Sequence, residues 1–193
     1  MASLMLPRPA RRAMRLRTVR WLVSGMILGL LAWPLLTHAV TPGEVEVGQV
    51  LRDATLRGLN GPSRQLSAFR GRPLIINVWA SWCGPCRAET ASLERLAWSE
   101  AGSHFSIIGI STDDDPRAAQ AWLKRSNATV NHYIDERLLM EYMLGATHMP
   151  LTVLVDANGR VLEKVVGAKE WDGAEARRLI AKAFKNPKIA PPR

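Results

Sequence analysis

The 193-residue sequence predicts an α/β domain in which a central mixed sheet is flanked by helices. Apolar runs rich in β-branched residues, typical of buried strands, alternate with stretches whose apolar residues recur at helical spacing. An Asn-Gly turn between two further apolar runs predicts an antiparallel hairpin near the C-terminus. A chain of this length ordinarily holds one domain with appendages.

The first long strand is predicted at residues 74–79, which read LIINVW after Pro73. Because apolar and polar residues do not alternate in it, we expect a central strand buried on both faces. Short strand-like runs and turn residues precede it over residues 43–71. A helix is predicted at 84–98, with Pro85 in its first turn, where a proline removes no helical hydrogen bond.

The middle of the chain repeats strand and helix twice. Residues 105–110 (FSIIGI) predict a second buried strand, and the DDDP run that opens residues 113–125 caps the next helix. A strand at 130–134 and a helix at 136–144 follow. Gly145 is expected to end that helix.

The C-terminal part predicts a hairpin and a last helix. Asn-Gly at 158–159 separates strands at 151–155 and 161–166, because these two residues tolerate the positive φ angles of a hairpin turn. An amphipathic helix is expected from residue 171 or 172 to 184. Residues 186–193 contain three prolines and are predicted to be a flexible tail.

The net charge of +9 is concentrated at the N-terminus. Six arginines fall within residues 1–39, which hold no acidic residue, so the rest of the chain carries 20 basic and 17 acidic residues. Because that remainder shows neither a basic stripe nor interleaved aromatic residues, we exclude nucleic-acid binding. Hydrophobic residues at 47% exclude a disordered chain.

The N-terminus has the layout of an export signal. An arginine-rich segment precedes the uncharged apolar run 21–36, and the small residues Thr37 and Ala39 follow, which fits cleavage after Ala39. The same run approaches the roughly 20 residues that span a membrane, so an uncleaved membrane anchor stays open. The folded domain is expected to comprise residues 40–185 and to face outward.

Cys83 and Cys86 are the only cysteines, which excludes a four-cysteine zinc site and disulfides between distant segments. The pair lies between a predicted buried strand and the first turn of a helix, where Cys-x-x-Cys is redox-active. The helix dipole should lower the pKa of the Cys83 thiol below about 8.5 and make it the nucleophile. Cys86, one turn later, is predicted to resolve the mixed disulfide.

The stretch from Asn77 to Glu89, NVWASWCGPCRAE, resembles the thioredoxin superfamily, and in particular its exported TlpA/ResA/CcmG-like branch. The resemblance covers roughly residues 48–184 and implies a thioredoxin-like fold. Three features point to this branch: Asn77 replaces a buried acid of thioredoxin itself, Glu89 stands three residues after the second cysteine, and a strand and helix are inserted at 128–144.

The resemblance also implies a cis-proline loop that faces the dithiol, and Met149-Pro150 matches it. Met149 departs from the small or β-branched residue common at this position. We expect its backbone to offer an edge to an extended client peptide. Trp82, Met149 and Pro150 are then the predicted substrate-binding residues, and Trp79 is expected in the active-site wall or simply in the core.

Glu89 lies at i+3 from Cys86, so both side chains can face one side of the helix. A partly buried carboxyl at this position would accept the proton that Cys86 loses. The resemblance likewise implies that an acid here tunes the active site. A solvated glutamate that favours the helix dipole is the alternative.

The sequence therefore predicts a monomeric, periplasmic thiol-disulfide oxidoreductase that works as a reductase without a cofactor. The Gly-Pro dipeptide between the cysteines resembles reducing members of the family. By resemblance, the electron donor is a transmembrane thiol carrier. The clients are proteins with disulfides at cytochrome c haem-attachment cysteines or at copper-site cysteines. Attachment to the inner membrane would run through residues 21–36.

A copper-binding metallochaperone is the alternative function, with Cys83, Cys86 and either His148 or Met149 as ligands. Related copper chaperones space their cysteines by three residues rather than two. A peroxidase is disfavoured because Ser-Trp precedes Cys83 where a peroxidase carries an upstream proline and threonine. The other histidines, expected on the surface or in loops, are His38, His104 and His132.

Overall fold

The computed structural model describes residues 43–192, so the predicted signal or anchor segment lies outside it. The strands are β1 (Thr55–Gly58), β2 (Arg64–Gln65), β3 (Leu74–Trp79), β4 (Ser106–Ser111), β5 (Asn131–Ile134), β6 (Leu151–Val155) and β7 (Val161–Val166). The helices are α2 (Gly84–Trp98), α3 (Pro116–Arg125), α4 (Leu139–Leu144) and α5 (Ala174–Ala183). Short 3-10 turns are η1 (Leu66–Phe69), η2 (Ala101–His104) and η3 (Pro187–Ile189).

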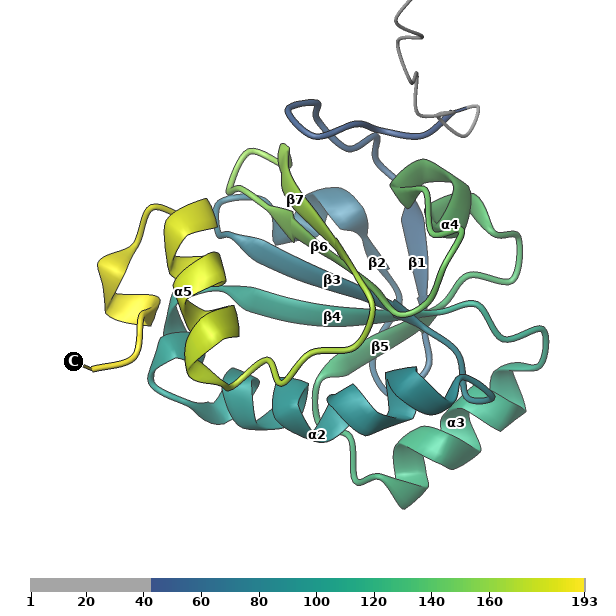
Figure 1. The fold of residues 1–193 in the computed structure, drawn as a ribbon. Helices are drawn as coiled ribbons and strands as arrows, with labels where there is room; N and C mark the ends of the chain where they lie inside the picture. The colour runs from purple at the N-terminus through teal and green to yellow at the C-terminus, as the bar shows by residue number, and fades with distance from the viewer. Residues whose placement is uncertain (1–42, 193) are drawn as a thin grey trace, which may run out of the picture. The chain divides into compact units, whose positions relative to one another are not determined.

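The seven strands form one mixed sheet in the order β2-β1-β5-β4-β3-β6-β7 (Figure 1). β3, β4 and β5 run parallel, and β1, β6 and β7 pair antiparallel with their neighbours. The predicted mixed α/β sheet is confirmed, and β5 and α4 occupy the predicted insertion. No helix within residues 43–192 has the length and apolarity needed to span a bilayer.

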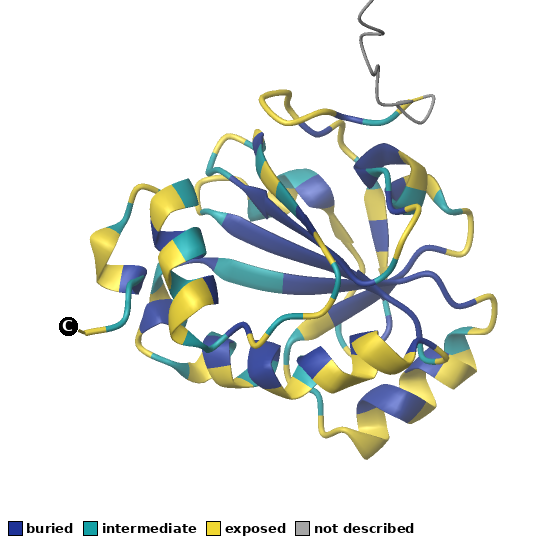
Figure 2. Ribbon diagram, in the orientation of Figure 1, coloured by how far each residue is buried: buried dark blue, intermediate teal, exposed yellow. Residues whose placement is uncertain are grey.

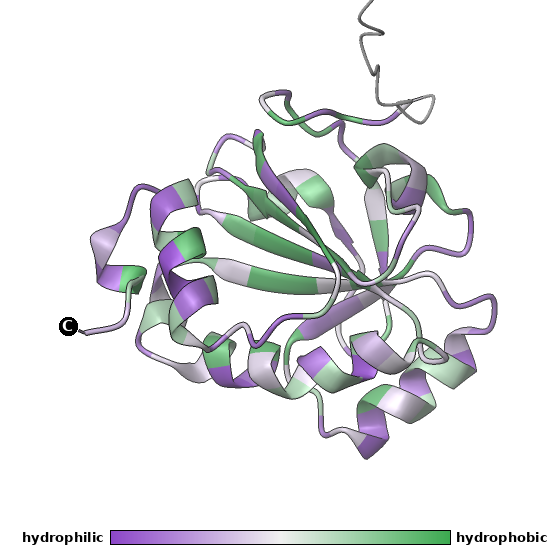
Figure 3. Cartoon of the chain, in the orientation of Figure 1, coloured by the Kyte–Doolittle hydropathy of each residue, from purple (hydrophilic) through white to green (hydrophobic). Residues whose placement is uncertain are grey.

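Each face of the sheet is covered by different elements. α2, α3 and α5 pack on one face, and α4 with the segment before β1 packs on the other (Figure 1). All six residues of β3 are buried, as expected for a central strand (Figure 2). The central strands are largely apolar (Figure 3). Ile76 and Val78 face α4, whereas Ile75 faces α2 and α5.

Local sequence explains where the helices begin and end. Cys83 is the N-cap residue of α2, with a proline in the first turn. Asp115 caps α3, because its side chain accepts the Arg117 N–H at 2.9 Å. α4 ends at Gly145, whose φ of 71° is left-handed, a conformation that glycine adopts without steric cost.

α4 is shorter than predicted, because it begins at residue 139 rather than 136. Leu138 has a left-handed backbone, with φ 55°, which interrupts a helix at that point. The Asp135 carboxylate accepts the N–H of Glu141 at 2.8 Å and so caps the later start.

α5 begins at residue 174 rather than 171 or 172, because Gly173 is its extended N-cap residue and Trp171 lies in the preceding loop. The predicted flexible tail, 186–193, also differs from expectation. It contains η3, and the Ile189 side chain is fully buried in the cluster that includes α5. Arg177 Nε donates to the Ile189 carbonyl at 3.0 Å.

Candidate active site

Cys83 and Cys86 lie where β3 ends and α2 begins, as predicted, and they are joined by a disulfide with Cα atoms 5.3 Å apart. Both cysteines are buried. The backbone N–H of Cys86 donates to Cys83 Sγ at 3.2 Å. When the pair is reduced, this N–H and the helix dipole stabilise negative charge on Cys83. The geometry thus supports Cys83 as the nucleophile.

The loop that leads into Cys83 is held by a buried carboxylate, that of Asp113. Asp113 accepts the Ser81 N–H at 2.9 Å and the Ser81 hydroxyl at 2.6 Å, and it also accepts the Ser111 hydroxyl at 2.7 Å. β3 and β4 are parallel and end at the same edge of the sheet, so the residues after β4 reach the loop after β3. Asp113 therefore holds the loop that precedes Cys83 in place, and it does not cap α3.

The Met149–Pro150 peptide bond is cis, as expected. Met149 is half-buried and packs against the cluster that contains both cysteines and Trp79. The Thr112 hydroxyl donates to Met149 Sδ at 3.3 Å. The Pro150 carbonyl accepts the Gly167 N–H at 2.9 Å. The structure therefore places the cis-proline loop beside the dithiol.

The two tryptophans near the cysteines differ in burial. Trp79 is 2% exposed and packs with the cysteines and with Trp122, whose ring centroid is 5.2 Å away. Trp82, one of the predicted substrate-binding residues, is 67% exposed. An exposed indole directly before Cys83 is suited to contacting a client protein.

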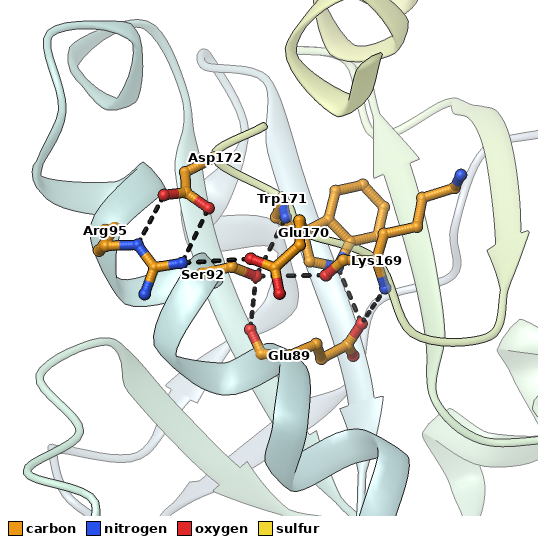
Figure 4. Close-up of polar contacts among 7 residues, drawn as sticks. All are labelled: Glu89, Ser92, Arg95, Lys169, Glu170, Trp171 and Asp172. Carbon is orange, nitrogen blue, oxygen red and sulfur yellow. Dashed lines mark hydrogen bonds and ion pairs between the residues drawn. The ribbon is translucent and has the colours of Figure 1, made fainter. Parts of the chain in front are cut away.

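Glu89 is 1% exposed, so the alternative of a solvated glutamate is wrong. Its Oε1 accepts Asn77 Nδ2 at 2.7 Å, and its Oε2 accepts Trp171 Nε1 at 2.9 Å and the Lys169 N–H at 3.2 Å (Figure 4). Burial raises the pKa of Glu89, and the hydrogen bonds from Trp171, Asn77 and Lys169 oppose that rise.

A polar row crosses the sheet beneath α2. Thr152, Asn77, Gly109 and His132 are neighbours on four adjacent strands, and Asn77 Nδ2 donates to Thr152 Oγ1 at 3.0 Å. His132, expected on the surface or in a loop, is 6% exposed. Burial lowers the pKa of His132 to about 3, so its ring is neutral. Gly109 provides the space, because a Cβ there would lie 2.0 Å from His132 Nδ1.

The two candidate copper ligands beyond the cysteines lie in different surroundings. Met149 packs against the cysteine cluster, whereas His148 is exposed, with Nδ1 3.2 Å from the Thr147 hydroxyl. Among residues 43–192, no three or more His, Cys, Asp or Glu side chains are grouped so as to hold a metal ion.

Sequence reasoning missed the roles of Asp113, Lys169 and Trp171. The Trp171 indole reaches Glu89 across 82 residues of sequence, and no local pattern marks such a contact. Asp113 stood within the DDDP run, where an N-cap role was the simpler interpretation. Its position directly after a buried parallel strand was the one available signal.

Known proteins resemble this chain in both sequence and fold. Residues 46–180 match the Redoxin family model. The chain is 31% identical over 157 residues to the thiol:disulfide interchange protein DsbE of Vibrio cholerae, over 76% of this chain and 83% of that protein. It is 27% identical over 153 residues to the thiol-disulfide oxidoreductase ResA of Geobacillus kaustophilus, over 78% and 87% of the two chains.

Solved structures agree with these sequence relatives. A Chlorobium tepidum protein regarded as a thiol:disulfide interchange protein DsbE superposes with a TM-score of 0.66 at 26% identity, over 72% of this chain and 99% of that one. Given the matched family model, the shared fold and a Cys-x-x-Cys pair at the helix N-terminus, the chain belongs to the Redoxin family and is a thiol-disulfide oxidoreductase of the DsbE/ResA type.

Proposed function

We propose that this protein is an exported reductase of protein disulfides in which Cys83 attacks the client and Cys86 resolves the intermediate. The main observation behind this proposal is that Cys83 Sγ, at the N-terminus of α2, accepts the Cys86 N–H beside the cis-proline loop. A donor aimed at this sulfur stabilises the thiolate more than the thiol, and the thiolate is the attacking form.

The proposed cycle begins with the reduced protein. The Cys83 thiolate attacks one sulfur of a client disulfide, the client S–S bond breaks, and the other client sulfur leaves as a thiolate. The Cys86 thiolate then attacks Cys83 Sγ, which forms the Cys83–Cys86 disulfide and releases the second client sulfur. The client gains two electrons and, with two protons, becomes a dithiol, while the protein is oxidised.

Three further residues serve this cycle in the proposal. Glu89, buried one helical turn after Cys86, accepts the proton that the Cys86 thiol loses. The backbone of Met149 pairs with an extended client segment. The exposed Trp82 side chain covers the client beside the reacting sulfur, in the manner of aromatic residues at interfaces.

The proposed location is the periplasm, with attachment to the inner membrane through residues 21–36 if the N-terminal segment is not cleaved. Each turnover leaves the protein oxidised in an oxidising compartment, so it requires electrons from a transmembrane thiol carrier. The proposed clients carry disulfides at cytochrome c haem-attachment cysteines or copper-site cysteines. The names of the DsbE and ResA relatives support thiol-disulfide exchange.

The reduction potential of the purified protein, equilibrated against glutathione, tests the direction of the reaction. We expect a value near the roughly −270 mV of thioredoxin, and a value near the roughly −120 mV of the oxidant DsbA would contradict the reductase role. Copper retained by the purified reduced protein in mass-based metal analysis would instead favour the metallochaperone.

Single cysteine variants test the order of attack. Cys83→Ser should abolish disulfide-reductase turnover, because the nucleophile is lost. Cys86→Ser should accumulate a mixed disulfide with the client, because only the resolving thiol is lost, and intact mass measurement detects that adduct. Equal activity in the two variants would remove the two-thiol mechanism.

A further inference from the structure

The loop at residues 167–173, between β7 and α5, is fixed to α2 by side chains at three successive helical turns. Glu89, Ser92 and Arg95 are spaced by three residues and therefore share one face of α2 (Figure 4). Ser92 Oγ accepts the Trp171 N–H at 3.0 Å. Arg95 pairs with Asp172 at 2.6 Å. The loop therefore has a defined position relative to the dithiol helix.

Trp171 lies at the centre of this contact. Its side chain is fully buried among residues of α2, α5 and the sheet. Its indole N–H donates to Glu89 Oε2 at 2.9 Å. An indole N–H is a donor only, so it can bond to a carboxylate oxygen but cannot accept a proton from a protonated carboxyl.

We propose that Trp171 is a positioning residue for thiol-disulfide exchange: its indole N–H holds the Glu89 carboxylate beneath Cys86, ready to accept the Cys86 proton. This inference rests on the proposed function, in which Glu89 is that acceptor. Helical side chains lean toward the helix N-terminus, so Glu89 covers the turn that contains Cys86.

The hydrogen bonds around Glu89 show why Trp171 matters. Oε1 is held by Asn77 Nδ2, and Oε2 is held by Trp171 and by the Lys169 N–H. Burial raises the pKa of Glu89, and the bond from Trp171 is the strongest opposing effect. Without it the carboxyl would keep its own proton to higher pH and could accept the Cys86 proton only above that pH.

The other charged groups near Glu89 are already engaged. The Lys169 ammonium pairs with Glu175 of α5 at 3.0 Å, and Arg95 of α2 pairs with Glu170 and Asp172. β3 and β6 contribute the neutral side chains of Asn77 and Thr152. The donors that hold Glu89 are thus the groups that set when it can take up a proton.

The experiment follows the reduced full-length protein reacting with the aromatic disulfide dithiobis-nitrobenzoate. The first released thionitrobenzoate reports attack by Cys83, and the second reports displacement by Cys86, so stopped-flow absorbance across pH separates the two steps. Trp171→Phe keeps an aromatic ring and removes the N–H. The matched control is Trp98→Phe, since Trp98 is 75% exposed at the far end of the same helix.

We expect Trp171→Phe to leave the first step unchanged and to move the second step to higher pH, with a midpoint proton concentration about tenfold lower. Trp98→Phe should match the wild type. If Trp171→Phe and Ser92→Ala shift the second step equally, Trp171 only holds the loop and the inference is wrong.

Glu89→Gln separates this inference from the proposal on which it rests. If Glu89→Gln leaves the pH profile of the second step unchanged, Glu89 is not the acceptor and that part of the proposed function fails. If Glu89→Gln slows the step but Trp171→Phe behaves as the wild type, only the inference about Trp171 fails.

A measurement on the unmodified sequence covers the case in which Trp171→Phe does not fold. The Trp171 indole N–H resonance in nuclear magnetic resonance spectra of the reduced protein should titrate with the midpoint of the second step and should lose that titration in Glu89→Gln. An indole N–H chemical shift that does not change with pH would overturn the inference.

Discussion

The two faces of the same sheet differ in chemistry. On the face under α2, β3 presents Asn77 between Thr152 and Gly109, and the row ends at His132. On the opposite face, under α4, the neighbouring register positions carry Ile76, Ile108 and Val153, all fully buried.

The two faces therefore have different roles: the α4 face stabilises the fold, and the α2 face carries the groups that can exchange protons. The α4 face buries only apolar surface there, which stabilises the fold and exchanges no protons. Buried polar groups cost free energy unless they are hydrogen-bonded, so the α2 face contributes less to stability than the apolar face. These polar groups lie directly beneath the helix that carries Cys83 and Cys86, where the reaction must move a proton.

The largest expected effect comes from removing side-chain volume on the apolar face. Ile76→Ala should reduce the free energy of unfolding by about 2–5 kcal/mol, because it loses buried contacts and leaves a cavity. The folded fraction should keep the wild-type rates with dithiobis-nitrobenzoate. Chemical denaturation and stopped-flow kinetics check the two parts, and a changed pH profile of the second step would show that the faces are not independent.

A second effect, confined to acidic pH, is expected at the far end of the polar row. The unfolded chain protonates His132 below about pH 6.5, but the folded protein does so only near a pKa of about 3, so stability should fall as the pH drops from 6.5 toward 3. The slope from this one group should be at most about 1.4 kcal/mol per pH unit.

His132→Leu tests whether His132 causes this loss of stability, because a leucine side chain does not titrate and is of comparable size. Its unfolding free energy, measured by denaturation between pH 7 and about pH 4, should depend less on pH than that of the wild type. Parallel curves for the two proteins would show that His132 does not supply the acid sensitivity.

The smallest effect should follow Arg95→Ala, which removes exposed ion pairs to Glu170 and Asp172 at the edge of the polar face. Solvent and salt screen such pairs, so the midpoint of thermal unfolding should change little and less still at high salt. A large shift in the second reaction step would show instead that the outer ion pairs, and not Trp171, position the loop.

The elements with strong local signals were predictable from sequence. β3 and α2 agree with the predicted ranges, because a mostly apolar run without alternation favours a buried strand and a Gly-Pro pair favours the first turn of a helix. The cis peptide bond at Pro150 came from the family resemblance and is confirmed. Site residues that lie on these elements, such as Cys83 and Cys86, were therefore predictable too.

Contacts between distant segments were not predictable in this way. The burial of His132 depends on Gly109 of the adjacent strand, and the later start of α5 depends on Trp171 reaching α2. Neither leaves a pattern in its own stretch of sequence. The expectation of a surface histidine and of a longer helix failed for that reason.

The C-terminal segment has a practical consequence for anyone shortening this protein. Residues 186–193 look dispensable in sequence, yet Ile189 is fully buried and two backbone carbonyls there accept bonds from Arg177. Ending the chain at Lys185 would uncover the apolar cluster behind α5 and leave that guanidinium without these acceptors.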